Sequence, residues 1–204
     1  MRKAMTRKGI LFAVLSVVLV AIVAFGVNTG CCETEGLAPV EVREYEGVDL
    51  SSINAFRENS IIGPQEIDVE SYTLRITGLV TNSKNYTYDE VVNEHQHYKK
   101  VVTMDCVEGW SVTILWEGVL IRDLLAEVGP LANATVLRFR AYDGYSTYLP
   151  IDYIIDNDIL MAYKMNDVIL PPERGFPFQL VAESKWGLKW IKWITEIELS
   201  NDAD

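Results

Sequence analysis

Apolar and polar side chains alternate along several short stretches between residues 50 and 200. The clearest stretch is 72–78, where Tyr72, Leu74 and Ile76 alternate with polar neighbours. This period of two is typical of a strand with one buried face. Further strands are predicted, from alternation or short apolar runs, at 98–106, 110–116, 136–141, 159–165, 178–182 and 189–199.

Residues 119–128 have helical spacing instead, because their large apolar residues share one helical face. These residues are Leu120, Leu124, Leu125 and Val128. Gly129-Pro130 follows and predicts the end of the helix. Turns are predicted at Asp143-Gly144 and Asn166-Asp167. Several strands with one or two helices predict a single, mixed, strand-rich α+β domain over residues 50–200.

The first 30 residues have the order of an export signal. Arg2, Lys3, Arg7 and Lys8 precede an uncharged, mostly apolar run over 9–29. Basic residues stay on the cytoplasmic side of a membrane, so the rest of the chain is predicted to be periplasmic or extracellular. The run is longer than a signal-peptide core of about 7–15 residues and nearly long enough to span a bilayer. Residues 1–30 are therefore predicted to be a signal peptide or a retained membrane anchor.

Two further interpretations of this region stay open. Gly30-Cys31 also fits a lipoprotein processing site, with lipid attached to Cys31. Arg7-Lys8 resembles the motif of the twin-arginine route, which exports proteins already folded around a cofactor. The acidic stretch 31–49 is predicted to be a linker that holds the domain off the membrane.

The negative net charge of the chain limits the kinds of ligand that it can bind. The chain has 204 residues and a formal net charge of −11. Residues 1–30 contain four of the 18 basic residues and no acidic one, so the remainder has a net charge of −15. Such an acidic body repels phosphate backbones, and a nucleic-acid function is excluded.

Cys106 is the one cysteine of the predicted domain, since Cys31 and Cys32 adjoin the apolar run. A disulfide framework within the domain is therefore excluded. An exported thiol oxidises unless it is buried or ligated, so Cys106 is either a small apolar core residue or a ligand.

His95 and His97 do not make a convincing metal site, because no further ligand at suitable spacing completes it. They are predicted to be solvated polar residues. The chain also lacks a Gly-rich phosphate loop, a Gly-x-Ser-x-Gly elbow and a His-Glu-x-x-His motif. These absences argue against kinase, hydrolase and zinc-protease functions.

Four basic residues lie close together near the end of this acidic chain. They are Arg174, Lys185, Lys189 and Lys192, and they follow the turn Leu170-Pro171-Pro172. The cluster either holds an anionic group in a pocket or forms a solvated face on an edge strand.

Two segments resemble a known family. Met104-Asp105-Cys106-Val107-Glu108-Gly109-Trp110-Ser111, followed by Trp116-Glu117-Gly118, is similar to the molybdenum-ligand segment of the sulfite oxidase-like molybdopterin-binding oxidoreductases. Residues 170–192 resemble the cofactor-binding segment of the same family. The similarity is greatest to the catalytic subunit of periplasmic methionine sulfoxide reductases, and it extends over residues 50–199.

The resemblance implies a sulfite oxidase-type molybdopterin-binding fold in which the Cys106 thiolate coordinates molybdenum. A pyranopterin dithiolene would hold the metal as well. The implied cofactor-binding residues are Asn54, Arg57, Glu58, Cys106, Arg174, Gln179, Trp190, Ile191 and Lys192. Gln179 replaces an Arg of the family, and Arg57 and Arg174 replace a Tyr and an Asn. Residues 107–111 lack the Arg of true sulfite oxidases, which argues against sulfite as substrate.

These observations predict an extracytoplasmic, membrane-tethered molybdenum-pterin oxidoreductase. It would carry out two-electron oxygen-atom transfer, either sulfoxide reductase-like or sulfite oxidase-like. Its substrate would be a small-molecule or protein sulfoxide. The sequence ends at Asp204 without a haem domain, so electrons would pass through a separate membrane haem protein or cytochrome. The alternative is a cofactor-free extracytoplasmic binding module of the same fold.

Overall fold

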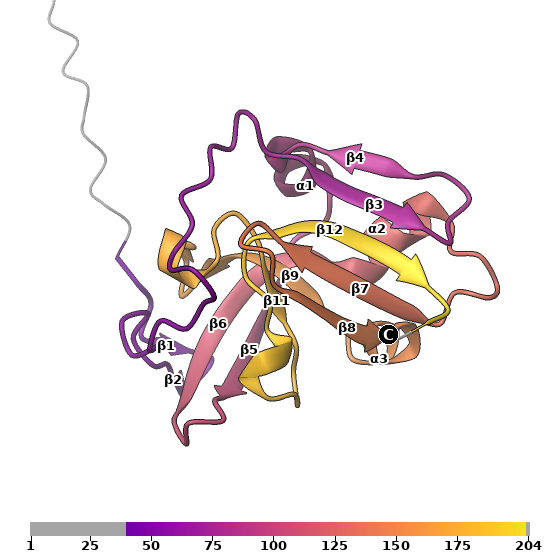
Figure 1. Cartoon of the computed structure of the whole chain (residues 1–204). Helices are drawn as coiled ribbons and strands as arrows, with labels where there is room; N and C mark the ends of the chain where they lie inside the picture. Colours follow the sequence, from indigo (N-terminus) through magenta and orange to yellow (C-terminus); the bar gives the residue numbers. More distant parts are fainter. Residues whose placement is uncertain (1–39, 203–204) are drawn as a thin grey trace, which may run out of the picture. The chain divides into compact units, whose positions relative to one another are not determined.

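Two five-stranded β-sheets carry most of the regular structure (Figure 1). The computed structural model describes residues 40–202, which fall within one compact unit. The first sheet contains β5 (Tyr98–Asp105), β6 (Ser111–Leu120), β9 (Leu160–Met165), β10 (Val168–Ile169) and β11 (Gln179–Val181). The second contains β3 (Leu74–Gly78), β4 (Lys84–Tyr86), β7 (Val136–Ala141), β8 (Ser146–Pro150) and β12 (Ile194–Ser200).

The first sheet is antiparallel, in the order β10-β9-β6-β5, with β11 also paired to β9. The second has the order β4-β3-β12-β7-β8. Its central strand, β12, pairs parallel with β3 and antiparallel with β7, as Figure 1 shows. Ile197 therefore lies between Ile76 and Phe139, and all three side chains are fully buried. The alternation in the sequence at 72–78 predicted this buried face.

Three short helices complete the hydrophobic core. They are α1 (Tyr88–Glu94), α2 (Ile121–Val128) and α3 (Ile151–Asp156). Each buries one side, through Val91, Leu124 and Ile154 respectively. These side chains join one cluster with residues of both sheets, so the sheets and helices form a single α+β domain, as predicted. Within residues 40–202, no helix has the length and apolarity needed to cross a membrane.

The helix predicted over 119–128 begins two residues later. Val119 and Leu120 instead extend β6, where they pair with Met161 and Leu160. Both are buried, and strand pairing takes precedence over their helical spacing. The predicted end is confirmed: Gly129 adopts a left-handed conformation with φ +65°, and its N–H donates to Leu125 O at 3.0 Å.

The strand predicted over 189–199 is wrong in its first half. Residues Gly187–Lys189 form a short 3-10 helix, η2, and β12 begins only at Ile194. Between them, Trp193 has φ +52°, a conformation that a strand does not accommodate. The chain at 190–193 therefore runs as a loop, which becomes one wall of the site described below.

The last ten residues of the predicted linker are bonded to the domain. Residues 40–49 include a hairpin of β1 (Glu44–Tyr45) and β2 (Val48–Asp49), whose turn residues Glu46 and Gly47 both have positive φ. Val42 N–H donates to Asn166 O at 2.9 Å. The acidic composition of residues 31–49, from which the linker was predicted, gave no indication of these hydrogen bonds. The predicted signal or anchor over 1–30, including the possible lipidation site at Cys31, lies outside the described residues.

The prediction that His95 is a solvated residue is wrong. Its side chain is 6% exposed, and Nε2 lies 3.0 Å from Glu127 Oε1. His95 is the residue that follows α1, and its ring nitrogen Nδ1 lies 3.1 Å from Glu90 O within that helix. The side chain of His95 is thus buried between α1 and α2, whereas His97 is exposed as predicted.

Candidate active site

A cavity of about 240 Å³ lies where five segments of the chain meet. The lining comes from residues 56–61, from the turn between β5 and β6, from 143–145, from 173–179 and from 187–193. Seven of the nine predicted site residues line it: Arg57, Cys106, Arg174, Gln179, Trp190, Ile191 and Lys192. The structure therefore brings together residues that lie as many as 135 positions apart in the sequence.

Cys106 follows the last residue of β5 and begins a tight turn. Its backbone N–H donates to Trp110 O at 2.9 Å, and Gly109 N–H donates to Cys106 O at 3.0 Å. Gly109 has φ +83°, which favours glycine at this corner. Among the described residues Cys106 is a free thiol, 7% exposed, on the cavity wall. The turn therefore presents a soft sulfur donor to the cavity.

Lys192 supplies a largely buried cation. Its side chain is 15% exposed, and Nζ donates to Glu58 Oε1 at 2.8 Å and to Glu173 O at 3.2 Å. Burial lowers the pKa of Lys192, although the carboxylate of Glu58 partly opposes this effect. Burial by itself would raise the pKa of Glu58, but hydrogen bonding with Lys192 and Ser60 outweighs it and lowers that pKa.

Arg174 supplies a second cation from η1 (Pro172–Arg174). Its Nε donates to Ile53 O at 3.2 Å, and Nη2 donates to Phe56 O at 3.1 Å. Burial lowers the pKa of Arg174, which nevertheless remains charged because a guanidinium starts so high. Gly175 follows with φ +96°, and a Cβ there would lie 2.9 Å from Lys192 Cβ. Glycine thus allows the two cations to approach the same cavity.

Aromatic rings make the wall behind Cys106. Phe56 packs edge-on against Trp110 and Trp116, with ring centroids 6.1 and 6.3 Å apart. Trp116 in turn packs against Trp190 at 5.7 Å. These rings exclude water from one side of the cavity, and they strengthen electrostatic interactions inside it.

The other predicted site residues have different positions. Gln179 and Ile191 are buried in the wall, and neither bears a charge. Glu58 does not line the cavity but pairs with Lys192. Asn54 is exposed and outside the lining, where its N–H donates to Ser52 Oγ at 3.2 Å. The resemblance grouped Asn54 with the cavity residues, and the structure separates it from them.

Sequence reasoning missed several polar residues of the cavity, among them Asp143 and Tyr145. Asp143 is buried and accepts a hydrogen bond from Tyr145 N at 2.9 Å. The Tyr145 hydroxyl donates to Leu188 O at 2.7 Å. Burial, reinforced by the charge of Asp143, raises the pKa of Tyr145. The signal in the sequence was Asp143-Gly144, which was interpreted only as a turn between strands.

The basic cluster of the sequence divides into two pairs. Arg174 and Lys192 line the cavity, which favours the anion-pocket interpretation for them. Lys185 and Lys189 lie outside the lining, with ammonium groups 4.5 Å above the ring of Tyr153 and 4.2 Å above that of Tyr148.

One cavity of this two-sheet α+β domain thus combines a buried thiol with two cations, a set of groups that suits an anionic ligand with a soft metal. The chain belongs to the oxidoreductase molybdopterin binding domain family, whose model matches residues 61–204. It is accordingly a molybdopterin-binding oxidoreductase, and its family implies a molybdenum-pterin cofactor.

Several known oxidoreductases are similar to this chain in sequence. An uncharacterized oxidoreductase, YuiH, of Bacillus subtilis is 29% identical over 140 residues, which are 68% of this chain and 70% of YuiH. A putative protein-methionine-sulfoxide reductase subunit, YedZ1, of Azospira oryzae is 29% identical over 67% of this chain and 52% of its own length. A nitrate reductase [NADH] of Phaseolus vulgaris is 26% identical over 65% of this chain, but only 19% of that enzyme is matched.

The fold has a solved counterpart. The sulfane dehydrogenase SoxCD of Paracoccus pantotrophus superposes with a TM-score of 0.69 and 21% identity. The match covers 83% of this chain and 50% of the SoxCD chain. This likeness confirms the predicted sulfite oxidase-type fold, whereas the family assignment rests on the family model.

The residues present fit the cofactor that the family implies. Cys106 offers a thiolate, the soft donor that suits molybdenum alongside a dithiolene. Lys192 and Arg174 offer positive charge for an anionic group such as a phosphate. Within residues 40–202 no group of three or more His, Cys, Asp or Glu side chains is arranged to hold a metal.

Proposed function

We propose that this domain is an extracytoplasmic, membrane-tethered molybdenum-pterin enzyme that reduces a sulfoxide. One observation carries the proposal: the buried Cys106 thiol lies in the wall of a cavity that Lys192 and Arg174 also line. The cofactor, when bound, would supply a two-electron redox change and exchange of one oxygen atom. A sulfoxide, two electrons and two protons would give a thioether and water.

The residues of the chain have separable tasks in this proposal. Cys106 would ligate the metal from its turn. Lys192 and Arg174 would bind the anionic part of the cofactor and orient it. The aromatic wall of Phe56, Trp110 and Trp190 would keep water from that side of the site.

The mouth of the cavity favours a neutral, partly apolar substrate. Ile61, Val107 and Leu188 line the cavity and are each more than half exposed. The nearby guanidinium of Arg57 lies 3.9 Å from the Glu108 carboxylate, which offsets its charge. Sulfite or nitrate would meet little unopposed positive charge at this rim, whereas a sulfoxide side chain would contact apolar atoms. The name of the Azospira relative, which refers to protein methionine sulfoxide, agrees with this choice.

The proposal also includes attachment of the domain to the membrane and a separate source of electrons. The basic residues and apolar run at the N-terminus support export and retention at the membrane. We propose that a separate membrane haem protein or cytochrome delivers the electrons. Protease treatment of spheroplasts would test the location, because an extracytoplasmic domain is digested while a cytoplasmic marker enzyme survives. Dependence on the twin-arginine route would agree with cofactor loading before export.

The decisive experiment measures molybdenum per chain in the full-length protein, purified from a host that makes the cofactor. We expect near-stoichiometric metal in the native protein, and loss of metal or altered coordination in Cys106→Ser. Val107→Ser, in the same turn, is the matched control and should keep its metal. Turnover with methionine sulfoxide should exceed turnover with sulfite. A folded native protein without molybdenum would instead favour a cofactor-free binding module.

A further inference from the structure

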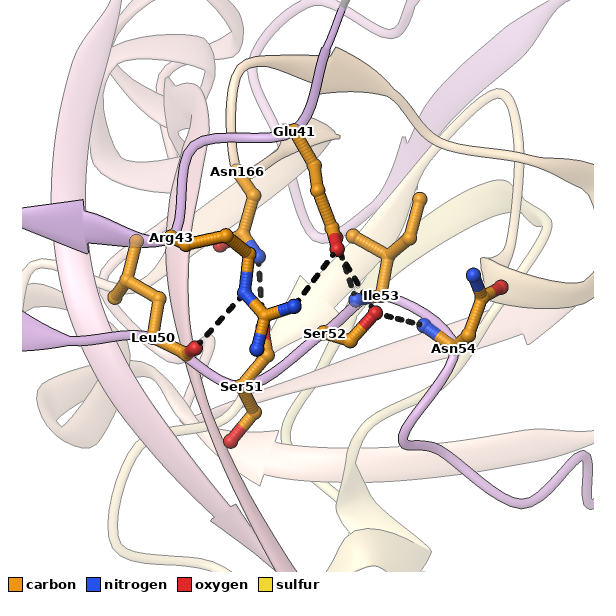
Figure 2. Close-up of polar contacts among 8 residues, drawn as sticks. All are labelled: Glu41, Arg43, Leu50, Ser51, Ser52, Ile53, Asn54 and Asn166. Atoms are coloured by element: carbon orange, nitrogen blue, oxygen red, sulfur yellow. Dashed lines mark hydrogen bonds and ion pairs between the residues drawn. The ribbon is translucent and has the colours of Figure 1, made fainter.

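Glu41 has an unusually complete set of partners for a residue before the first strand (Figure 2). Its Oε2 accepts a hydrogen bond from Ile53 N–H at 2.8 Å. Its Oε1 accepts from the Ser52 hydroxyl at 2.8 Å and from Arg43 Nη1 at 3.2 Å. The side chain is 20% exposed, so these bonds are partly shielded from water.

The backbone that Glu41 binds is also held from the cavity side. Ile53 donates its N–H to Glu41, while its carbonyl accepts from Arg174 Nε at 3.2 Å. Arg174 reaches further along the same segment and donates to Phe56 O at 3.1 Å. The backbone of Ile53 is therefore hydrogen-bonded through its N–H to the Glu41 carboxylate and through its carbonyl to the Arg174 guanidinium, which lines the cavity.

Apart from the buried ring of Phe56 and the ion pairs of Arg57 and Glu58, segment 51–58 is held mainly by hydrogen bonds. It contains no helix or strand, and its position depends on bonds to side chains and a few backbone bonds. Asn166 Nδ2 donates to Ser51 O at 2.8 Å, as Figure 2 also shows, and Ser51 N–H donates to Thr113 O at 2.8 Å. A loop fixed mainly by side chains moves when one of them is lost.

The same segment carries one side of the candidate site. Phe56 and Arg57 line the cavity, and Glu58 accepts the hydrogen bond from Lys192. A shift at Ile53 would thus move an aromatic wall and the partner of a cavity cation together. Glu41 touches none of the cavity-lining residues directly, so any effect on the cavity passes through the backbone of 52–56.

From this geometry we infer that Glu41 is a positioning residue, which fixes segment 51–58 and thereby slows the release of the cofactor from the cavity. The inference rests on the proposed function, because it takes the cavity to be the cofactor site. Glu41 is the second described residue, so the start of the described chain is hydrogen-bonded to the segment that carries Phe56 and Arg57.

The experiment compares Glu41→Ala with Glu44→Ala in the full chain loaded with cofactor. Glu44 lies three residues after Glu41, at the start of β1, and its side chain is exposed, so its variant controls for the loss of a carboxylate. Glu41→Gln keeps one acceptor oxygen, which can still accept from Ile53 N–H, so its exchange and release rates should fall between those of Glu41→Ala and the native protein. The readouts are hydrogen exchange of the Ile53 amide and the rate at which molybdenum and pterin leave the folded protein.

We expect Ile53 exchange to accelerate about tenfold in Glu41→Ala, because its acceptor is lost, and release to accelerate about threefold or more. Glu44→Ala should change neither rate. Faster exchange with unchanged release would overturn the inference and leave Glu41 a merely structural residue. Unchanged exchange would overturn it as well.

If Glu41→Ala does not fold, the same two rates are measured in Ser52→Ala, which removes the hydrogen bond from the Ser52 hydroxyl to Glu41. A native protein without molybdenum would refute the proposed function and the inference with it, whereas normal metal and unaffected release would refute the inference alone.

Discussion

The ammonium group of Lys192 lies 2.8 Å from the carboxylate of Glu58, although 134 positions separate the two residues in the chain. This pair joins the first segment of the cavity to the last one. A buried cation with a single carboxylate partner still has hydrogen-bonding capacity, since an ammonium has three donors and a backbone carbonyl takes one of the others. Lys192 can therefore keep Glu58 and contact an anionic ligand as well.

Lys192→Gln should weaken cofactor retention more than it weakens the fold. The variant removes a positive charge from the cavity, so we expect the affinity for the cofactor to fall about tenfold, which corresponds to about 1.4 kcal/mol, and the molybdenum retained after dialysis to fall with it. Mass spectrometry of the metal, referred to protein concentration, measures this change. Lys185→Gln, outside the cavity lining, is the control and should retain its molybdenum. Equal losses in both variants would show that the effect is one of overall charge.

Glu117 should make the stability of the domain depend on acid pH. Its carboxylate is 9% exposed and accepts hydrogen bonds from Tyr163 Oη at 2.9 Å and Lys164 Nζ at 2.8 Å. Burial would raise its pKa, but Lys164, Tyr163 and Lys99 together outweigh burial and lower it. A pKa that is lower in the folded state stabilises the protein above the unfolded value of 4.5, and this stability is lost as the pH falls through the folded pKa.

Glu117→Gln tests this dependence directly. At pH 7 we expect its free energy of unfolding to be about 1–3 kcal/mol below that of the native protein, because charge-assisted hydrogen bonds are lost. Below the folded-state pKa the two proteins should converge, since both then carry a neutral side chain. Urea unfolding between pH 7 and pH 3 measures the difference. A difference that stays constant over this range would contradict the assignment.

Asn166 is the buried link between the first sheet and segment 51–58. Its Oδ1 accepts from Leu115 N–H at 3.1 Å, and its backbone has φ +49° in the turn that the sequence predicted. Asn166→Gly keeps this backbone without strain but removes the amide, and we expect a loss of about 1–3 kcal/mol for the unsatisfied groups. Asn166→Ala should lose about 1 kcal/mol more, because alanine resists positive φ. Thermal unfolding of both variants measures the two contributions, and equal losses would argue against backbone strain.

Local patterns were sufficient for much of the fold. The alternation at 72–78 predicted β3, and Asn166-Asp167 predicted the turn before β10. Helix α1 was missed, although Thr87 and Glu90 form a capping box, because it has seven residues and buries only Val91 fully. Strand β8 was also missed, although its buried Thr147 and Leu149 alternate with exposed residues over the same length as β3.

The candidate site was predictable only in part. Cys106 was identified by being alone in its domain and by the motif around it. Asp143 and Tyr145 were missed because they reach the cavity through the pairing of β7 with β8 and the packing of η2, neither of which a local pattern specifies. Asn54 matches a position of the motif but lies outside the cavity lining, so its part in cofactor binding stays a prediction.

The central position of β12 fixes an order of events during protein synthesis. Residues 194–200 leave the ribosome after every other strand of the described chain, yet they pair with both β3 and β7. The second sheet cannot close until then, and Lys192, just before β12, cannot meet Glu58. A growing chain therefore exposes Cys106 long before it has a site that can hold a cofactor. On the proposed function, cofactor insertion therefore follows completion of the chain through β12.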